Sequence, residues 1–271
     1  IADYAGSGDG PNPAAGAAVG QRALRLDGVA KVNGTEVFGA DYWPADAPVV
    51  RAIRSPHHRA AFSFGDLETW RANLPGVEAV FTAADIPGRN AFGVIPPLAD
   101  QPALAENIAR MRGEAVALVA GDAKAMEALD LDTFPIESTP LAPVLSTPEG
   151  AAPAPPPLHS PRPGHIPPKG RVVRGDAAAG LSSATPSAEA AIETSFVEHA
   201  YIEPEAGTAW MDGDVLTIQA CTQAPVMDRD DVALVLDMPQ DRVRIIPATA
   251  GGGFGSKLDV SLQPLIGLVT L

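Results

Sequence analysis

Short apolar runs and helical segments follow one another along the first half of the chain. Val49–Arg54 and Ala115–Ala120 have the length and apolar content of β-strands. Asp66–Asn73 and Asp122–Leu131 each begin with an aspartate, a preferred N-cap residue, and they predict helices. Strands and helices that do not alternate strictly indicate an α+β domain, here over residues 21–145.

Residues 146–170 break this pattern with nine prolines. Proline fixes φ and removes a backbone donor, so we expect this segment to form neither a helix nor a central strand. A proline-rich chain is stiff and extended, and the segment is therefore predicted to be a linker. Residues 1–20, rich in glycine, alanine, proline and aspartate, are predicted to form a flexible tail.

Apolar runs resume after the linker and indicate a second unit over residues 171–271. The sequence stops inside Pro264–Leu271, which has the pattern of an amphipathic or buried helix start without a capping signal, a place where a natural domain seldom ends. The strands of this unit are predicted near Ala191–Phe196, Thr208–Met211, Val215–Ala220 and Val243–Ile246, and a helix near Asp228–Leu236.

A dense group of glycines lies in Ala250–Lys257, directly after the strand-like run Arg242–Pro247. Glycines permit left-handed backbone conformations and let a ligand approach main-chain N–H groups, which suits anions. The spacing departs from a P-loop because Ser256 precedes Lys257, and it lacks the third glycine of a dinucleotide-binding fingerprint. The residues alone leave open an anion-binding loop or a glycine-rich turn without a ligand.

Gln223 follows the predicted strand Val215–Ala220, where the apolar run stops. A side-chain amide at this place can accept a hydrogen bond from the backbone while its nitrogen donates to a bound oxygen. The alternative is an exposed polar residue at the end of a strand.

Several short motifs occur along the chain in a fixed order. They are Leu26–Gly34, Phe38–Tyr42, Arg54–His57, Leu74–Val77, Arg112–Ala117, Phe196–Gly207, Cys221–Pro225 and Gly251–Gly255. In this order they resemble the molybdenum-binding subunit of the xanthine dehydrogenase and aldehyde oxidase family of molybdenum hydroxylases. The resemblance extends from about Leu24 to the C-terminus.

The resemblance implies an α+β fold and roles for five residues. Residues 21–145 would form a hammerhead-like domain and residues 171–271 the first part of a larger molybdopterin-binding domain. Gln223 matches the family glutamine that contacts the apical oxygen on molybdenum, and Phe254 matches the aromatic residue beside the metal; neither ligates it directly. The main-chain amides expected to face the molybdenum and the pterin dithiolene are those of Gly252, Gly253, Phe254 and Gly255.

Packing of the Phe254 ring in the core is an alternative role that would also fix the loop amides. Two other loop positions depart from the family pattern. Leu258 stands where animal xanthine dehydrogenases carry a purine-contacting glutamate, with Asp259 one residue later, and Ser256 replaces a common glycine. An apolar side chain cannot form a hydrogen bond with a purine edge, so an N-heterocycle or aldehyde is expected as substrate in place of xanthine.

Family enzymes hydroxylate their substrates with water-derived oxygen, using a glutamate base that lies in their C-terminal portion. The resemblance therefore implies that this chain alone is inactive and needs the rest of its subunit. It also implies a molybdenum-pterin cofactor, as such or as the cytosine dinucleotide, with 2Fe–2S clusters and FAD on an iron–sulfur subunit and a FAD subunit.

A second polar cluster, formed by Glu198, His199, Glu203 and Glu205, raises the question of a metal site. Pro204 interrupts the alternation of a strand and a second histidine is missing, so structural hydrogen bonds are the favoured interpretation. Cys221, the single cysteine, excludes an internal disulfide and is expected to be a small buried apolar group.

Composition and charge narrow the classes of partner and function that the sequence allows. Over 271 residues the net charge is −14 and the pI about 4.6, which argues against nucleic acid or an anionic membrane as partner. No apolar run has the ~20 residues that a membrane span needs. The expected location of the protein is the cytoplasm, and the periplasm is the alternative. Two rival functions stay open, a nucleotide- or phosphate-binding module and a non-catalytic assembly fragment.

Overall fold

Two three-stranded antiparallel sheets are built from the first half of the chain. The computed structural model describes residues 25–151, 158–159, 165 and 170–271. The strands of the first sheet, in the order β1-β5-β3, are Val49–Arg54, Ala115–Gly121 and Val77–Thr82. Those of the second, in the order β4-β2-β6, are Ile108–Ala109, Ala60–Phe64 and Ile136–Pro140. Every residue of the central strand β5 is buried, which explains its continuous apolar run.

Aspartate caps begin the two helices predicted in this half. The Asp66 carboxylate accepts a hydrogen bond from the Thr69 amide at 2.9 Å and starts α2, Leu67–Ala72. Asp122 starts α3, Ala123–Ala128, in the same way. The second helix was predicted to reach Leu131 but ends earlier, because Asp130 caps a separate 3₁₀ turn over Leu131–Thr133. The other short elements here are α1 Gly28–Asn33 and the 3₁₀ turns Gly39–Asp41, Ala83–Asp85 and Pro96–Leu98.

The third sheet, in the order β7-β8-β9, belongs to the second half. Its strands are Gly207–Asp212, Val215–Ala220 and Val243–Pro247; β7 is antiparallel to β8, and β9 is parallel to it. Helix α6, Pro225–Val235, connects β8 to β9. It begins with a proline in its first turn, where no N–H donor is needed. The short turn Gln240–Arg242 precedes β9, and α7, Gln263–Thr270, packs on β7, β8 and α6.

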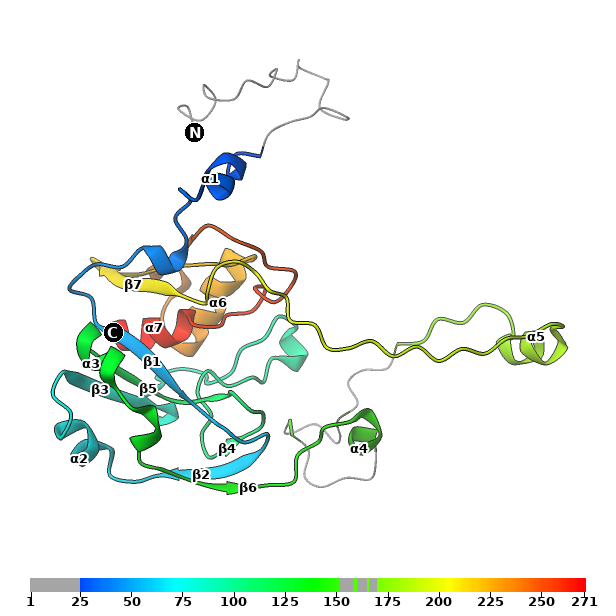
Figure 1. The fold of residues 1–271 in the computed structure, drawn as a ribbon, viewed down its shortest axis with the longest axis horizontal. Helices are drawn as coiled ribbons and strands as arrows, with labels where there is room; N and C mark the ends of the chain where they lie inside the picture. Colours follow the sequence, from blue (N-terminus) through cyan, green and yellow to red (C-terminus); the bar gives the residue numbers. More distant parts are fainter. Residues whose placement is uncertain (1–24, 152–157, 160–164, 166–169) are drawn as a thin grey trace, which may run out of the picture.

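One hydrophobic core joins the two halves, so the sheets form a single body on one side of Figure 1. Leu118 of β5 packs in the same cluster as Ile218 of β8, Val232 of α6 and Leu268 of α7. The mixed arrangement of sheets and helices confirms the predicted α+β class.

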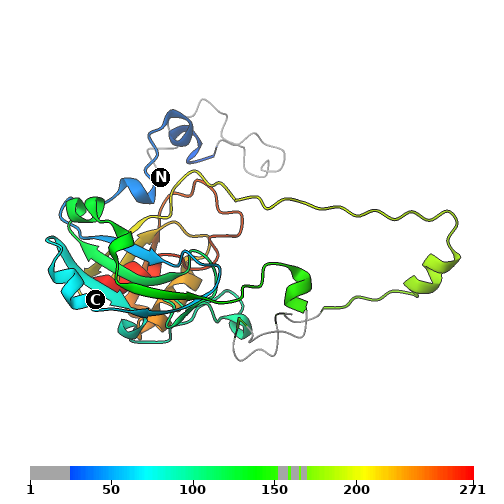
Figure 2. The ribbon, with the colours of Figure 1, turned by 60° about the horizontal axis from the view of Figure 1, so that its bottom comes forward.

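Residues 170–200 leave this body as a long arm that carries α5, Ala177–Ser183, at its tip (Figures 1 and 2). The strand predicted near Ala191–Phe196 is wrong, since the structure has no strand there and Ile192 and Phe196 are fully exposed. Its apolar residues have the composition of a strand, but no described segment lies beside them to form the ladder that a strand requires.

The proline-rich segment also departs from expectation, because α4, Thr147–Ala151, lies inside it. Pro148 is in the first turn, where a proline costs no hydrogen bond, and the Glu149 carboxylate accepts from the amides of Leu145 and Ser146. Most of the predicted linker, like the predicted tail over residues 1–20, lies outside the described residues. No helix among the described residues is long and apolar enough to cross a membrane.

Candidate functional site

The glycine-rich loop and Gln223 lie at the same edge of the third sheet. Strands β8 and β9 run parallel, so their carboxyl ends meet, and the chain continues from them into Cys221–Gln223 and Ala248–Lys257. The Ala248 amide donates to the Ala220 carbonyl at 2.9 Å and holds the two connections together. The carboxyl ends of parallel strands are a common place for ligand sites in α/β sheets.

Gln223 is hydrogen-bonded to the loop through its oxygen. Its Oε1 accepts from the Gly255 amide at 2.9 Å, and its own backbone N–H donates to the Lys257 carbonyl at 2.8 Å. Because the Gly255 N–H can only donate, the side-chain oxygen faces it and Nε2 points elsewhere. Among the described residues Nε2 has no hydrogen-bond partner, and the side chain is exposed. Acceptance from the backbone was expected from the sequence, and donation by Nε2 to a bound oxygen stays a prediction.

Three loop amides are also without a partner. Within the part of the chain that the structure describes, the N–H groups of Gly252, Gly253 and Phe254 donate no hydrogen bond. The Gly255 amide, expected to face the cofactor, is instead bound to Gln223. Main-chain N–H groups without a partner are donors that an anionic group can use.

The backbone of the loop leaves no room for larger side chains. Gly252 and Gly255 have φ of +150° and +98°, a region that glycine favours. A Cβ at Gly253 would lie 2.5 Å from Gln223 Oε1. Phe254 has φ of +51° and is 70% exposed, so the alternative role of packing in the core does not hold, and its place beside the metal stays a prediction. The left-handed backbone conformation of Phe254 directs its ring toward solvent.

A buried ion pair lies under the loop. Lys257 Nζ donates to Glu203 Oε1, and the two side chains are 3% and 1% exposed. Glu203 also accepts from the Gly251 amide and from Cys221 Sγ. Sequence reasoning missed this pair, because its members are 54 residues apart and carry no local motif.

The second polar cluster forms structural contacts. Glu203 is paired with Lys257, while Glu205 lies 3.5 Å from the same amine and accepts from Ser261 Oγ at 2.6 Å. Glu198 accepts from the Ala200 amide. The described residues contain no group of three or more side chains arranged to hold a metal ion. Cys221 is buried, as predicted, and burial together with the Glu203 carboxylate raises the pKa of its thiol to about 11.

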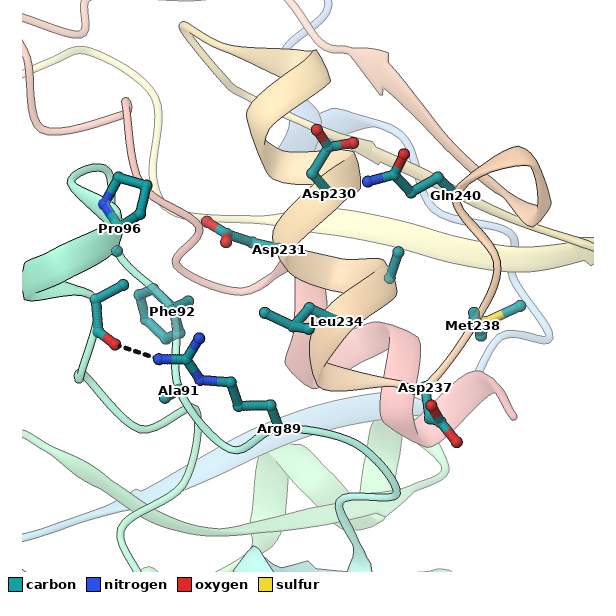
Figure 3. Close-up of a pocket in the computed structure, with 13 residues that line it drawn as sticks. Arg89, Ala91, Phe92, Pro96, Asp230, Asp231, Leu234, Asp237, Met238 and Gln240 are labelled. Carbon is teal, nitrogen blue, oxygen red and sulfur yellow. Dashed lines mark hydrogen bonds between the residues drawn. The ribbon is translucent and has the colours of Figure 1, made fainter.

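A pocket of about 430 Å³ lies beside α6, lined by none of the predicted site residues. Figure 3 shows Asp231 directed into it opposite Phe92 and Pro96, with Arg89 hydrogen-bonded to the Ala99 carbonyl at 2.8 Å. Burial, followed by the charges of Asp259 and Asp230, raises the pKa of Asp231 to about 6.

Asp231→Asn is expected to stabilise the folded protein at pH 7 by roughly 1–3 kcal/mol. Folding raises the pKa of Asp231 from 3.8 to about 6. Between these pH values the folded state binds one proton more than the unfolded state, so the protein loses stability as the pH rises from 3.8 to about 6. Asparagine removes this loss. Thermal unfolding at pH 7, 5 and 4 should show a gain at pH 7 that vanishes near pH 4. Exposed Asp46→Asn is the control, and a pH-independent difference for Asp231→Asn would contradict the expectation.

Two family models match the chain. The model of the molybdopterin cofactor-binding domain matches residues 158–271, and that of the aldehyde oxidase and xanthine dehydrogenase a/b hammerhead domain matches residues 33–131.

Curated relatives match nearly the whole chain. It is 35% identical over 253 residues to the nicotinate dehydrogenase large molybdopterin subunit of Eubacterium barkeri, covering 93% of this chain and 58% of that protein. It is 31% identical over 258 residues to the xanthine dehydrogenase molybdenum-binding subunit of Escherichia coli O157:H7, covering 91% of this chain and 34% of that one. The chain therefore spans about a third to three fifths of the length of these relatives.

Solved structures share the fold. The aldehyde oxidoreductase of Desulfovibrio gigas superposes with a TM-score of 0.77 at 23% identity, over 91% of this chain and 28% of that one. Quinoline 2-oxidoreductase of Pseudomonas putida 86 superposes with a TM-score of 0.72 at 22% identity, over 87% of this chain and 31% of that one. The order of the motifs, the two domain matches and the shared fold agree. The chain belongs to the aldehyde oxidase and xanthine dehydrogenase family, as part of a molybdenum-binding subunit.

Proposed function

We propose that this chain holds one side of a molybdenum-pterin cofactor in an enzyme that hydroxylates an N-heterocycle or an aldehyde. The observation that carries the proposal is a set of donors at one sheet edge that have no partner among the described residues, namely Gln223 Nε2 and the amides of Gly252, Gly253 and Phe254. When bound, the cofactor supplies oxygen transfer to the substrate and accepts its electron pair.

The residues of the chain would act by orientation. Main-chain amides fixed by the loop would donate to anionic atoms of the bound cofactor, and Gln223 Nε2 would donate to one of its oxygen atoms. Gln223 suits this role because the Gly255 amide already fixes its oxygen, so the nitrogen is directed without further reorganisation. The exposed Phe254 ring would pack beside the metal centre, next to the amides of Gly252 and Gly253.

A phosphate-binding module is less well supported. In phosphate loops the lysine reaches the phosphates. Here Lys257 is 3% exposed and paired with Glu203, so its charge is directed away from any ligand on the open face of the loop. The loop can offer an anion its dipoles but no free cation.

The test is molybdenum and pterin analysis of the protein purified from its host with its partners. The proposal requires molybdenum and a fluorescent pterin after oxidation. Thermal stabilisation of a cofactor-free protein by phosphate would support the phosphate-binding module instead. The absence of both results would leave an assembly role. Release of a cytidine nucleotide on mild hydrolysis would identify the dinucleotide form of the pterin.

The proposed electron path needs partners. We expect electrons to leave through 2Fe–2S clusters to FAD on other chains or domains of a cytoplasmic complex, together with the remaining part of the molybdenum subunit. Co-purification of iron, flavin and molybdenum in one species tests this expectation.

The substrate is proposed to be a nicotinate-like heterocycle or an aromatic aldehyde. Leu258 is 38% exposed beside the loop and offers only apolar contact. Asp259, one residue later, could offer a carboxylate to a purine. Its side chain is half-buried, and its Oδ1 is buried without a hydrogen-bond partner among the described residues, so this oxygen is not open to a ligand. A relative that shares 35% identity is named as a nicotinate dehydrogenase subunit.

Steady-state assays of the complete enzyme with xanthine, nicotinate and an aromatic aldehyde should therefore give xanthine the lowest kcat/KM. Leu258→Glu should improve the relative kcat/KM for xanthine, because a carboxylate can form a hydrogen bond with the purine. Preference of the parent enzyme for xanthine would refute the role of Leu258 and leave the family assignment intact.

A further inference from the structure

The Glu203 carboxylate binds both ends of the glycine-rich loop. Its Oε2 accepts from the Gly251 amide at 2.6 Å, at the start of the loop. Its Oε1 accepts from Lys257 Nζ, at the end of the loop. The Cys221 thiol donates to the same Oε1 at 2.9 Å, from the chain that leads to Gln223. One side chain thus connects both ends of the loop to the segment that leads to Gln223.

The pair is charged although it is buried. Burial would raise the pKa of Glu203, yet hydrogen bonds from Cys221 and Lys257 hold this pKa below its ordinary value. Burial would lower the pKa of Lys257, but the bond to Glu203 and the charge of Glu205 raise it. The amine also lies 3.8 Å from the centre of the Tyr201 ring. Both groups are therefore ionised at neutral pH.

A buried ion pair contributes little net stability, because desolvation of two charges opposes their attraction. Its geometric effect is larger. The carboxylate has fixed positions for its acceptor lone pairs, so it sets the spacing between Gly251 and Lys257 and hence the curvature of the loop between them.

We propose that Glu203 and Lys257 are a positioning pair that aims the free amides of Gly252, Gly253 and Phe254 at their ligand. Neither side chain touches the cofactor. The inference rests on the proposed function for the identity of the ligand but not for the order of the loop.

The experiment replaces the pair by apolar residues of similar size, Glu203→Leu with Lys257→Met, in the complete protein purified with its partners. Such exchanges of buried ion pairs usually preserve folding. The matched control removes an exposed pair on the same sheet, Asp212→Asn with Arg244→Gln, since these two side chains are 60% and 52% exposed. Three quantities are measured: the Tm, molybdenum per subunit, and hydrogen–deuterium exchange of the loop amides of Gly255 and Ser256, which donate to Gln223 Oε1 and to the Gly253 carbonyl.

In the apolar pair variant we expect the Tm to stay close to that of the parent. Loop exchange should become at least about tenfold faster, and cofactor retention should fall by about 10- to 100-fold. The control should match the parent in all three. Glu203→Gln with Lys257→Met, which keeps the size and leaves no unpaired buried charge, serves if the first double variant does not fold, and changes in exchange and molybdenum in the same direction are expected.

Unchanged loop exchange in a folded variant would overturn the proposal. If the parent holds no molybdenum, the proposed function fails, while the exchange measurement still decides whether the pair orders the loop.

Discussion

Gly253→Val is expected to abolish cofactor incorporation while leaving the fold intact. A Cβ at this position would lie 2.5 Å from Gln223 Oε1 and 2.6 Å from its Cδ, well inside contact distance. Valine adds two methyl groups beyond that atom, so Gln223 must leave the loop and the Gly255 amide loses its acceptor. The expected result is a protein with less than about a tenth of the parental molybdenum content.

In Gly253→Val the strain would come from a steric clash with Gln223 and not from an unfavourable φ. Left-handed φ values occur at Gly252, Phe254 and Gly255, and Gly253 is not among them. Gly180→Val in α5 is the control, because a Cβ there meets no atom within 4 Å. Molybdenum occupancy equal to that of the parent, in a folded Gly253→Val protein, would show that the loop is only a turn.

Gln223→Ala is expected to slow reduction of the enzyme by its substrate by about 10²–10³-fold, the usual effect of removing one oriented donor. The substitution removes Nε2, a side-chain donor without a partner among the described residues, and Oε1, the acceptor of the Gly255 amide. Rapid-mixing kinetics should be expressed per bound molybdenum, so that a loss of donation is separated from a loss of cofactor.

A second variant separates the two functions of the side chain. Gln223→Glu keeps an oxygen for the Gly255 amide but replaces the donor by an acceptor, so it should retain the metal and show the kinetic defect. Gln240→Ala, in an exposed turn, is the control. Parental reduction rates per molybdenum in both Gln223 variants would contradict the assigned role.

Features encoded in neighbouring residues could be predicted from the sequence. Strand β1 was predicted with its observed bounds, Val49–Arg54, and the caps Asp66 and Asp122 mark their helices through contacts three residues away. The place of Gln223 at a strand end also follows from the local pattern, because the apolar run of β8 stops at Ala220.

Features that depend on distant partners could not be predicted in this way. A strand near Ala191–Phe196 needs a neighbouring strand, and the described residues supply none. The Glu203–Lys257 pair and the effect of Asp259 on Asp231 both arise from residues brought together by folding. Phe254 has the side chain of a core residue, and only its backbone conformation shows that it points outward.

The most direct test of the central claim is anomalous diffraction at the molybdenum edge from crystals of the complete protein. The account predicts a strong peak beside the loop, within reach of Gln223 Nε2 and of the Gly252, Gly253 and Phe254 amides, which donate no hydrogen bond to any described residue. A molybdenum peak on another face of the chain, or none in crystals of protein shown to contain the metal at this subunit, would contradict it.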